Sequence, residues 1–148
     1  MSMHTTKTIE RVAHMRFSGS LDTNALLRLL LNDIPKQHEA TKKLLIQAEK
    51  QLAVADAAII ELVFVLARYY GLSRPQVNEA VTGLMQLQQI NCNRALFEKA
   101  LLLYLSRPAL SFEDCCLSTY ATLNEAEPLW TFDKKLASQA ANTRLITA

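Results

Sequence analysis

Glycine and proline are scarce in this sequence, with three and four copies in 148 residues. Together they fall well below the average usage of about 12%. An all-β sandwich needs turn residues roughly every ten positions, so the scarcity argues against that class and favours long helices. Apolar residues make up 50% of the chain and charged residues 20%. This composition excludes a disordered or fibrous chain and supplies enough apolar surface for the core of one domain.

Cysteine is also rare, and its placement excludes two classes of small domain. The three cysteines, Cys92, Cys115 and Cys116, are odd in number and form no C-x-x-C pair. Neither a disulfide framework nor a zinc site fits that pattern. We expect buried free thiols in a reducing compartment.

No segment has the character of a signal peptide or a membrane span. The first residues are polar and mixed in charge, and the longest apolar stretch, 57–67, is interrupted by Glu61. That stretch is far shorter than the roughly 20 residues that a span needs. We therefore expect a cytoplasmic protein with no membrane contact. Residues 1–14 are expected to be an N-terminal extension, and residues 15–148 one domain.

Neither bulk charge nor common ligand motifs indicate a function. The formal net charge is +2, which is too small to indicate nucleic-acid binding by itself. The three glycines are isolated, so the sequence has no glycine-rich phosphate loop. Asn24 occupies the position at which an aspartyl phosphatase would carry the second acid of its D-x-D motif.

Short apolar runs alternate with helical patterns along the chain. Capping residues such as Asp22, Asn93 and Ser111 precede segments in which apolar residues recur with helical spacing. Strands that alternate with helices form βαβ crossovers, which give a parallel sheet with helices on both faces. The sequence therefore predicts a single α/β domain with a central parallel sheet of four to five short strands and about seven covering helices. The strands are expected at 17–21, 52–55, 89–92, 128–131 and 144–146.

Four acids stand at related places in this arrangement. Asp22 and Asp133 follow predicted strands, Glu61 lies early in a helix after a strand, and Asp114 lies in the first turn of a helix. The carboxyl ends of parallel strands share one edge of a sheet, so we expect the four acids to meet there. Clustered carboxylates repel one another unless a divalent cation neutralises them, and oxygen ligands suit Mg²⁺ or Mn²⁺. Such a site is typical of phosphodiester hydrolysis.

Each acid also has a purely structural interpretation. Asp22 and Asp133 can cap helices, and Ser111 with Asp114 resembles a capping box. Glu61 is the only charge within 57–67 and has apolar neighbours on every side. Burying an unpaired carboxylate is costly, so we expect Glu61 to have a cation, a metal or a raised pKa. An ion pair with Arg68 or with Arg28 is the structural alternative.

Four motifs in this order resemble a known family. PIN-domain ribonucleases, and among them the VapC toxins of bacterial toxin–antitoxin pairs, are similar to the chain over about residues 17–146. The motifs that carry the resemblance are Asp22-Thr23-Asn24, Glu61-Leu62-Val63-Phe64-Val65-Leu66, Phe112-Glu113-Asp114 and Thr131-Phe132-Asp133-Lys134.

The resemblance implies an endoribonuclease that depends on Mg²⁺ or Mn²⁺, forms a homodimer and is neutralised by a cognate antitoxin protein. A catalytically silent PIN-like module that binds a partner protein is the alternative, and DNA cleavage is a weaker one. The implied site residues share acidic, supporting or substrate-binding roles. They are Asp22, Glu61, Asp114 and Asp133 as catalytic and metal-binding acids, Asn24 and Thr131 as supporting polar groups, and Lys134, Lys135 and Arg28 as contacts to RNA.

Overall fold

The computed structural model describes residues 3–147, and in this range the chain forms eight helices and five strands. Seven of the helices are those that the sequence predicts, and a further helix, α1, precedes them. The helices are α1 (Met3–Ala13), α2 (Thr23–Leu30), α3 (Pro35–Gln47), α4 (Asp56–Arg68), α5 (Arg74–Met85), α6 (Arg94–Ser106), α7 (Phe112–Leu123) and α8 (Lys134–Gln139). The strands are β1 (Gly19–Ser20), β2 (Leu52–Ala53), β3 (Ile90–Asn91), β4 (Leu129–Thr131) and β5 (Thr143–Leu145).

All five strands pair in parallel, which confirms the predicted α/β class. They divide into two sheets, one with the order β1-β2-β3 and a smaller one made of β4 and β5. In the larger sheet Ser20 lies beside Ala53, and Ala53 lies beside Asn91. The carboxyl ends of β1, β2 and β3 therefore share one edge, and the helices α2, α4 and α6 begin just beyond it.

Local capping explains where several helices begin. Asp22, Ser111 and Asp133 are the N-cap residues of α2, α7 and α8. Each accepts a hydrogen bond from a backbone N–H in the first turn, which would otherwise lack a partner. Pro35 opens α3 at the position where proline costs no hydrogen bond. Ser73 forms a reciprocal capping box with Gln76 at the start of α5.

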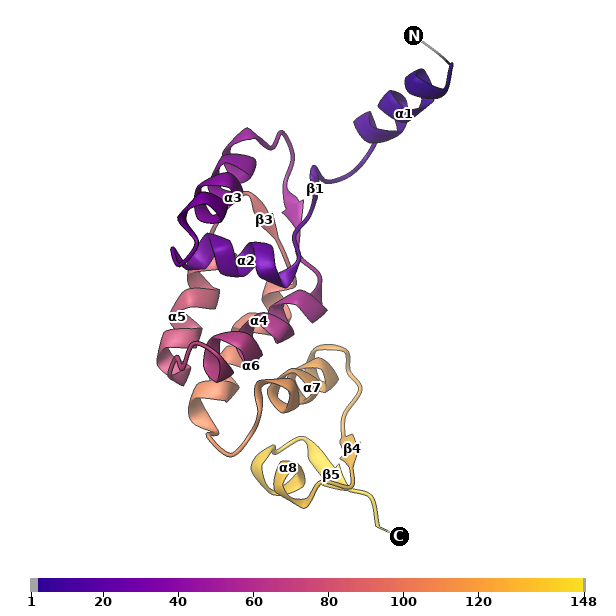
Figure 1. Cartoon of the computed structure of the whole chain (residues 1–148). Helices are drawn as coiled ribbons and strands as arrows, with labels where there is room; N and C mark the ends of the chain where they lie inside the picture. Colours follow the sequence, from indigo (N-terminus) through magenta and orange to yellow (C-terminus); the bar gives the residue numbers. More distant parts are fainter. Residues whose placement is uncertain (1–2, 148) are drawn as a thin grey trace.

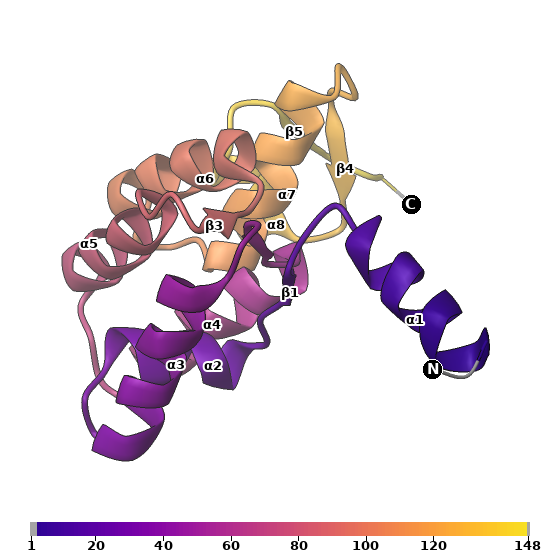
Figure 2. The ribbon, with the colours of Figure 1, turned by 90° about the horizontal axis from the view of Figure 1, so that it is seen from above.

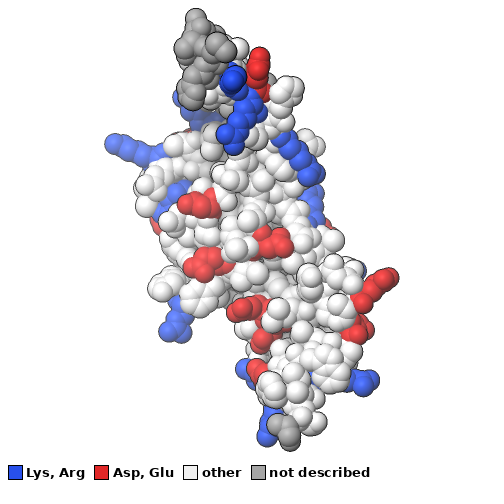
Figure 3. All heavy atoms as spheres, turned by 90° about the vertical axis from the view of Figure 1, so that its right-hand side faces the viewer, with Lys and Arg blue, Asp and Glu red and all other residues white. Residues whose placement is uncertain are grey.

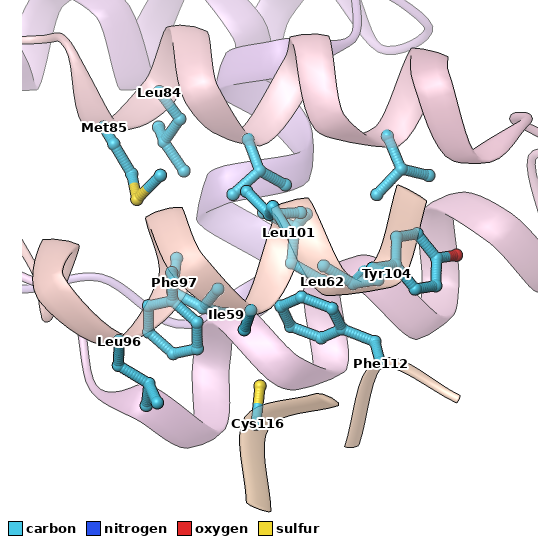
Figure 4. Packing of buried hydrophobic residues seen from close by; sticks show 14 of the residues in the cluster. Ile59, Leu62, Leu84, Met85, Leu96, Phe97, Leu101, Tyr104, Phe112 and Cys116 are labelled. Atoms are coloured by element: carbon cyan, nitrogen blue, oxygen red, sulfur yellow. The ribbon is translucent and has the colours of Figure 1, made fainter. Parts of the chain in front are cut away.

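The core lies between helices α4, α5, α6 and α7 (Figure 4). Phe97 of α6 stacks on Phe112 of α7 with ring centroids 6.1 Å apart. The ring of Tyr104 meets Phe112 edge-on at 5.4 Å. Free thiols complete this packing, because Cys115 and Cys116 are buried and Cys92 is partly buried. The sequence-based prediction of buried free thiols thus holds for the α7 pair.

Helix α1 projects away from the rest of the molecule (Figures 1 and 2). It coincides with the segment predicted to be an N-terminal extension. Within residues 3–147, no helix is both long enough and apolar enough to cross a membrane.

The last part of the chain, β4, α8 and β5, forms a small unit that we call the C-terminal unit (residues 129–145). Figure 1 places it at the end of the molecule opposite β1, with α7 between it and the larger sheet. Leu136 and Ala140 of this unit join the common core. Asn142 ties it to α7, because its Nδ2 donates to the carbonyl oxygen of Ser118 at 2.8 Å and its Oδ1 accepts from the Ser118 hydroxyl at 2.8 Å.

Candidate active site

Two of the predicted site acids cap helices and still keep an oxygen for other work. Asp22 accepts a hydrogen bond at Oδ1 from the N–H of Ala25, at 2.8 Å. Asp133 accepts at Oδ1 from the N–H of Leu136, at 3.1 Å. Within residues 3–147 no hydrogen bond reaches the second oxygen of either carboxylate. The structural and the functional interpretation of these acids are therefore compatible, because capping fixes one oxygen and leaves the other exposed.

Asp114 sits in the capping box that the sequence predicts at the start of α7. Its backbone N–H donates to the Ser111 hydroxyl at 3.1 Å, and its Oδ2 accepts from the Ser111 N–H at 3.4 Å. The side chain is half-buried. As with Asp22 and Asp133, one carboxylate oxygen is used in the cap.

Glu61 is exposed, which corrects the expectation of a buried charge. The run 57–67 looks apolar throughout, but α4 buries only one face, with Ile59, Leu62 and Leu66 fully enclosed. Glu61 lies on the opposite stripe together with Phe64, which is 53% exposed although it is apolar. Water therefore solvates the carboxylate. Neither an ion pair nor a hydrogen bond of Glu61 is found in the described part of the chain.

The two predicted alternative partners of Glu61 differ. Arg68 lines the same groove as Glu61, but no ion pair between them is found among residues 3–147. Arg28 is engaged elsewhere. Arg28 donates from Nη1 to Asp33 at 3.0 Å and from Nη2 to the hydroxyl of Tyr70 at 3.0 Å. Tyr70 in turn donates to the other oxygen of Asp33, which closes a three-membered cluster. Desolvation opposes ionisation of Asp33, but the Tyr70 hydrogen bond and the Arg28 charge outweigh it and lower the pKa of that carboxyl. Arg28 thus joins the end of α2 to the end of α4.

A groove of about 530 Å³ runs between α4 and α7. Glu61 lines it from α4, and Ser111 and Glu113 line it from the start of α7. Its walls are otherwise largely apolar, with Phe64 and Phe112 among them. Sequence reasoning did not single out Glu113. It is the residue next to Asp114, so its exposure on the groove side could be recognised only once the helix orientation was known.

Arg74 holds the loop that leads into α7. Its guanidinium donates to the carbonyl oxygens of Tyr104 and Leu110, each at 2.7 Å, and to that of Arg107 at 3.3 Å. It also lies over the Tyr104 ring, 4.0 Å from the centroid. These contacts fix the end of α6 and the loop before Ser111, and so they position the groove side of α7.

Hydrogen bonds between their first residues hold the starts of α2, α4 and α6 together. The hydroxyl of Thr23, next to Asp22, donates to the carbonyl oxygen of Ala58 in the first turn of α4, at 3.1 Å. Asp56, the first residue of α4, accepts at Oδ2 from the side chain of Asn93 at 3.4 Å. Asp22, Asp56 and Asn93 therefore follow three neighbouring parallel strands at one sheet edge.

Asp56 is a further acid of this edge, and the sequence analysis did not place it among the site acids. The available signal was the same as for Asp22, since Asp56 follows a strand by a few residues. Burial and, to a smaller degree, its negative charge raise the pKa of two thiols elsewhere in the chain, those of Cys92 and Cys116. Desolvation raises the pKa of Cys92, and the charge of Asp56 adds to that rise. Desolvation raises the pKa of Cys116 to about 12, with the negative charges of Cys115, Asp56 and Glu113 adding to it.

The four predicted acids do not form one closed cluster. Among residues 3–147, no three His, Cys, Asp or Glu side chains lie close enough together to hold a metal ion. The sheet arrangement gives the reason for Asp133, because β4 pairs with β5 rather than with β1. The donor chemistry nevertheless suits Mg²⁺, which keeps several waters and takes only one or two carboxylates together with substrate phosphates. Exposed acids with an unused oxygen meet that requirement, whereas a protein cage for the ion is absent in this range.

The remaining predicted site residues lie on the surface near these acids. Thr131 accepts at its hydroxyl from the N–H of Asp133 at 3.0 Å and so supports the turn into α8. Asn24 is exposed in the first turn of α2. Lys134 and Lys135 are exposed in the first turn of α8. Figure 3 shows that acidic side chains gather across the middle of one face, with basic side chains mainly toward the two ends.

Parallel strands followed by helices with carboxylates at their starts place the chain in the class of α/β domains. A comparison with families of known domains matches residues 20–142 to the PIN domain. The chain therefore belongs to the PIN domain family, and the match includes every acid considered above. A comparison with curated proteins found no match. Membership in this family supports a hydrolase of the nuclease type with RNA as its class of ligand.

Proposed function

We propose that this protein is a metal-dependent endoribonuclease of the cytoplasm and the toxin of a type II toxin–antitoxin pair, related to the VapC group. In this proposal it acts as a homodimer and is neutralised by a cognate antitoxin protein. The observation that carries the proposal is the state of Asp22 and Asp133. Each uses one carboxylate oxygen to cap a helix and keeps the other without a hydrogen bond among the described residues.

The proposed site consists of Asp22, Glu61, Asp114 and Asp133, with Asp56 as a fifth acid at the same sheet edge as Asp22. A bound Mg²⁺ or Mn²⁺ would supply an activated water and offset the charge on the scissile phosphate. The protein's own part is to fix its carboxylates. Asp22 and Asp133 each have one carboxylate oxygen held by a backbone N–H. The position of the other oxygen is therefore already fixed before a ligand binds.

Helix starts contribute to substrate attraction in this proposal. The N-terminus of a helix carries partial positive charge, and it favours phosphate groups near its first turn. Helices α2 and α7, whose N-cap residues are Asp22 and Ser111, offer such ends beside acids of the proposed site. Phosphate contacts of this kind, together with Lys134 and Lys135, would make RNA binding weaken as salt rises.

The test is cleavage of a structured RNA by the wild-type protein in Mg²⁺ or Mn²⁺, compared with EDTA and with Asp22→Asn. Asparagine caps a helix about as well as aspartate does, so the variant retains its fold but loses a charged metal ligand. We expect EDTA to abolish cleavage and Asp22→Asn to reduce its rate at least about a hundred-fold. Glu39→Gln is the matched control, because Glu39 is an exposed acid of α3 that is paired, among residues 3–147, with Lys42 alone, and it should cleave like the wild type.

Two outcomes would assign a different function. Equal behaviour of wild type and Asp22→Asn, without Mn²⁺ binding, would identify a silent module that binds a partner protein. Cleavage of single-stranded DNA but not of RNA of the same sequence would identify a deoxyribonuclease. The toxin role has its own test, in which expression arrests growth, Asp22→Asn relieves the arrest, and the product of a neighbouring gene restores growth.

A further inference from the structure

Two large aromatic side chains are exposed at the end of β4. Trp130 is 57% exposed and Phe132 is 69% exposed. Trp130 is the central residue of β4, and Phe132 lies in the bend that directly follows the strand, while Leu129 and Thr131 are partly buried. We call the exposed surface of these two rings the aromatic face. Phe132 directly precedes Asp133. The aromatic face thus adjoins one of the proposed catalytic acids.

Positive charge surrounds this aromatic face. Arg144 of β5 is the register neighbour of Trp130 and is exposed, so it lies on the same face of the small sheet. Lys134 and Lys135 follow Asp133 and are also exposed. Figure 3 shows basic side chains at the lower end of the molecule, where Figure 1 places the C-terminal unit. A polyanion complements this arrangement better than an apolar partner would.

Two other exposed aromatic residues differ from this pair, because each already has a ring beside it. Phe64 of α4 and Tyr69, the residue that follows α4, meet each other edge to face, with centroids 6.2 Å apart, so each already has an aromatic neighbour. The described part of the chain records no ring contact for Trp130 or Phe132. Their faces are free, which is the state that a stacking ligand requires.

We propose that Trp130 and Phe132 form a stacking platform for unpaired bases of RNA, with Arg144, Lys134 and Lys135 contacting the adjoining phosphates. This inference rests on the proposed function, since the ligand is the substrate of the same site. Every base has an aromatic face, so stacking on protein rings tolerates all sequences and requires only that the bases be unpaired. The platform therefore selects single-stranded segments over duplex RNA and places them beside Asp133.

The single tryptophan of the chain allows a direct test, because its fluorescence reports on Trp130 alone. The full-length protein is titrated in EDTA with a single-stranded RNA of about ten nucleotides, a length within the usual site sizes for such surfaces. We expect the fluorescence of Trp130 to be quenched on binding. Phe132→Leu, which keeps the fluorophore, should weaken binding about ten-fold, as expected from loss of one stacked base.

Control ligands and variants separate stacking from charge. An abasic strand with the same number of phosphates should bind more weakly and leave the fluorescence unchanged, and an RNA duplex should do the same. Tyr69→Leu, which removes an aromatic residue that is 75% exposed directly after α4, should bind like the wild type. Trp130→Leu, followed by the anisotropy of a labelled strand, should lose as much affinity as Phe132→Leu. Both substitutions are at exposed positions, and circular dichroism checks that the variants are folded.

Three results would overturn the platform. The first is equal quenching of Trp130 fluorescence by the abasic strand. The second is an unchanged affinity for RNA in both Phe132→Leu and Trp130→Leu. The third is a change in Trp130 fluorescence with protein concentration alone, accompanied by a doubled mass of the protein in solution. The last result would mean that a second copy of the chain covers this face. Binding in EDTA does not depend on cleavage, so quenching without later cleavage in Mg²⁺ would sustain the platform and refute the nuclease. Cleavage with a raised KM and unchanged kcat in Phe132→Leu would support both.

Discussion

The larger sheet with its helices and the C-terminal unit are built from the same kinds of element but are held in different ways. Helices α4 to α7 meet through fully buried side chains such as Ile59, Leu62 and Phe97. The C-terminal unit contributes two buried apolar residues to that core, Leu136 and Ala140. The partly buried Leu129 packs against the core as well, and hydrogen bonds of Asn142 tie the unit to α7.

This difference separates the proposed site acids into two groups. The positions of Asp22, Glu61 and Asp114 follow from the packing of α2, α4 and α7, so they depend on the apolar core. The position of Asp133 depends in addition on the polar joint at Asn142. We infer that the larger region supplies a fixed part of the site, and that the C-terminal unit supplies the part whose placement is set by a few hydrogen bonds.

The largest expected effect comes from the apolar region. Leu101→Ala removes a side chain that is 1% exposed, and the cavity should lower the free energy of unfolding by about 2–5 kcal/mol. Leu102→Ala, one residue further along α6, removes a side chain that is 66% exposed and should change it by less than about 0.5 kcal/mol. Urea denaturation measures both. Similar losses in the two variants would contradict a core located between α4, α5, α6 and α7.

How far the sequence predicts this structure depends on whether the signal is local. The caps of α2, α7 and α8 could be predicted because Asp22, Ser111 and Asp133 act within their own first turn. The exposure of Glu61 could not, since it depends on which face of α4 the other helices cover. Apolar residues such as Phe64 on the uncovered face hide the amphipathic pattern.

The sequence could predict that the strands pair in parallel, but it could not predict which strands pair with each other. Alternation of strands and helices predicts parallel pairing, and all five strands pair in this way. The separation of β4 and β5 from β1 is a tertiary property of strands of two or three residues. Such short strands make few hydrogen bonds, so side-chain contacts such as that between Asn142 and Ser118 influence where they lie. For this reason the expected meeting of Asp22 and Asp133 could not be derived from the strand pattern.

An intermediate effect is expected at the joint between the two regions. Asn142→Ala removes the donor to Ser118 and to the Thr122 hydroxyl, 2.9 Å away, and leaves polar groups without partners. The loss should be about 1–3 kcal/mol, which corresponds to roughly ten-fold faster hydrogen exchange or more in the C-terminal unit. The amides of Leu129 and of Ile146, the residue that follows this unit, donate to the carbonyl oxygens of Asn142 and Thr131 and report that change.

The same experiment tests whether the two regions open separately. The amides of Leu21 and Val54, which donate to carbonyl oxygens of the larger sheet, should exchange at an unchanged rate. Asn124→Ala is the control, because the side chain of Asn124 makes one hydrogen bond among the described residues, to the carbonyl oxygen of Tyr120 at the exposed end of α7. Equal acceleration of all four amides by Asn142→Ala would mean that the molecule opens as one unit.

The smallest expected effect concerns the thiols of α7, which lie on the side of the apolar core. Burial raises the pKa of Cys115 to about 11 and that of Cys116 to about 12, from 9.0. A raised pKa means that their stabilising contribution is complete below pH 9.0 and is lost as the pH rises through those folded values. At pH 8 both thiols are almost entirely protonated, so iodoacetamide should label the partly buried Cys92 first. Asn142→Ala should leave the order and the rates of cysteine labelling unchanged, because opening the C-terminal unit does not expose the core side of α7. Rapid labelling of Cys115 in that variant would show that the apolar region depends on the hydrogen bonds of Asn142.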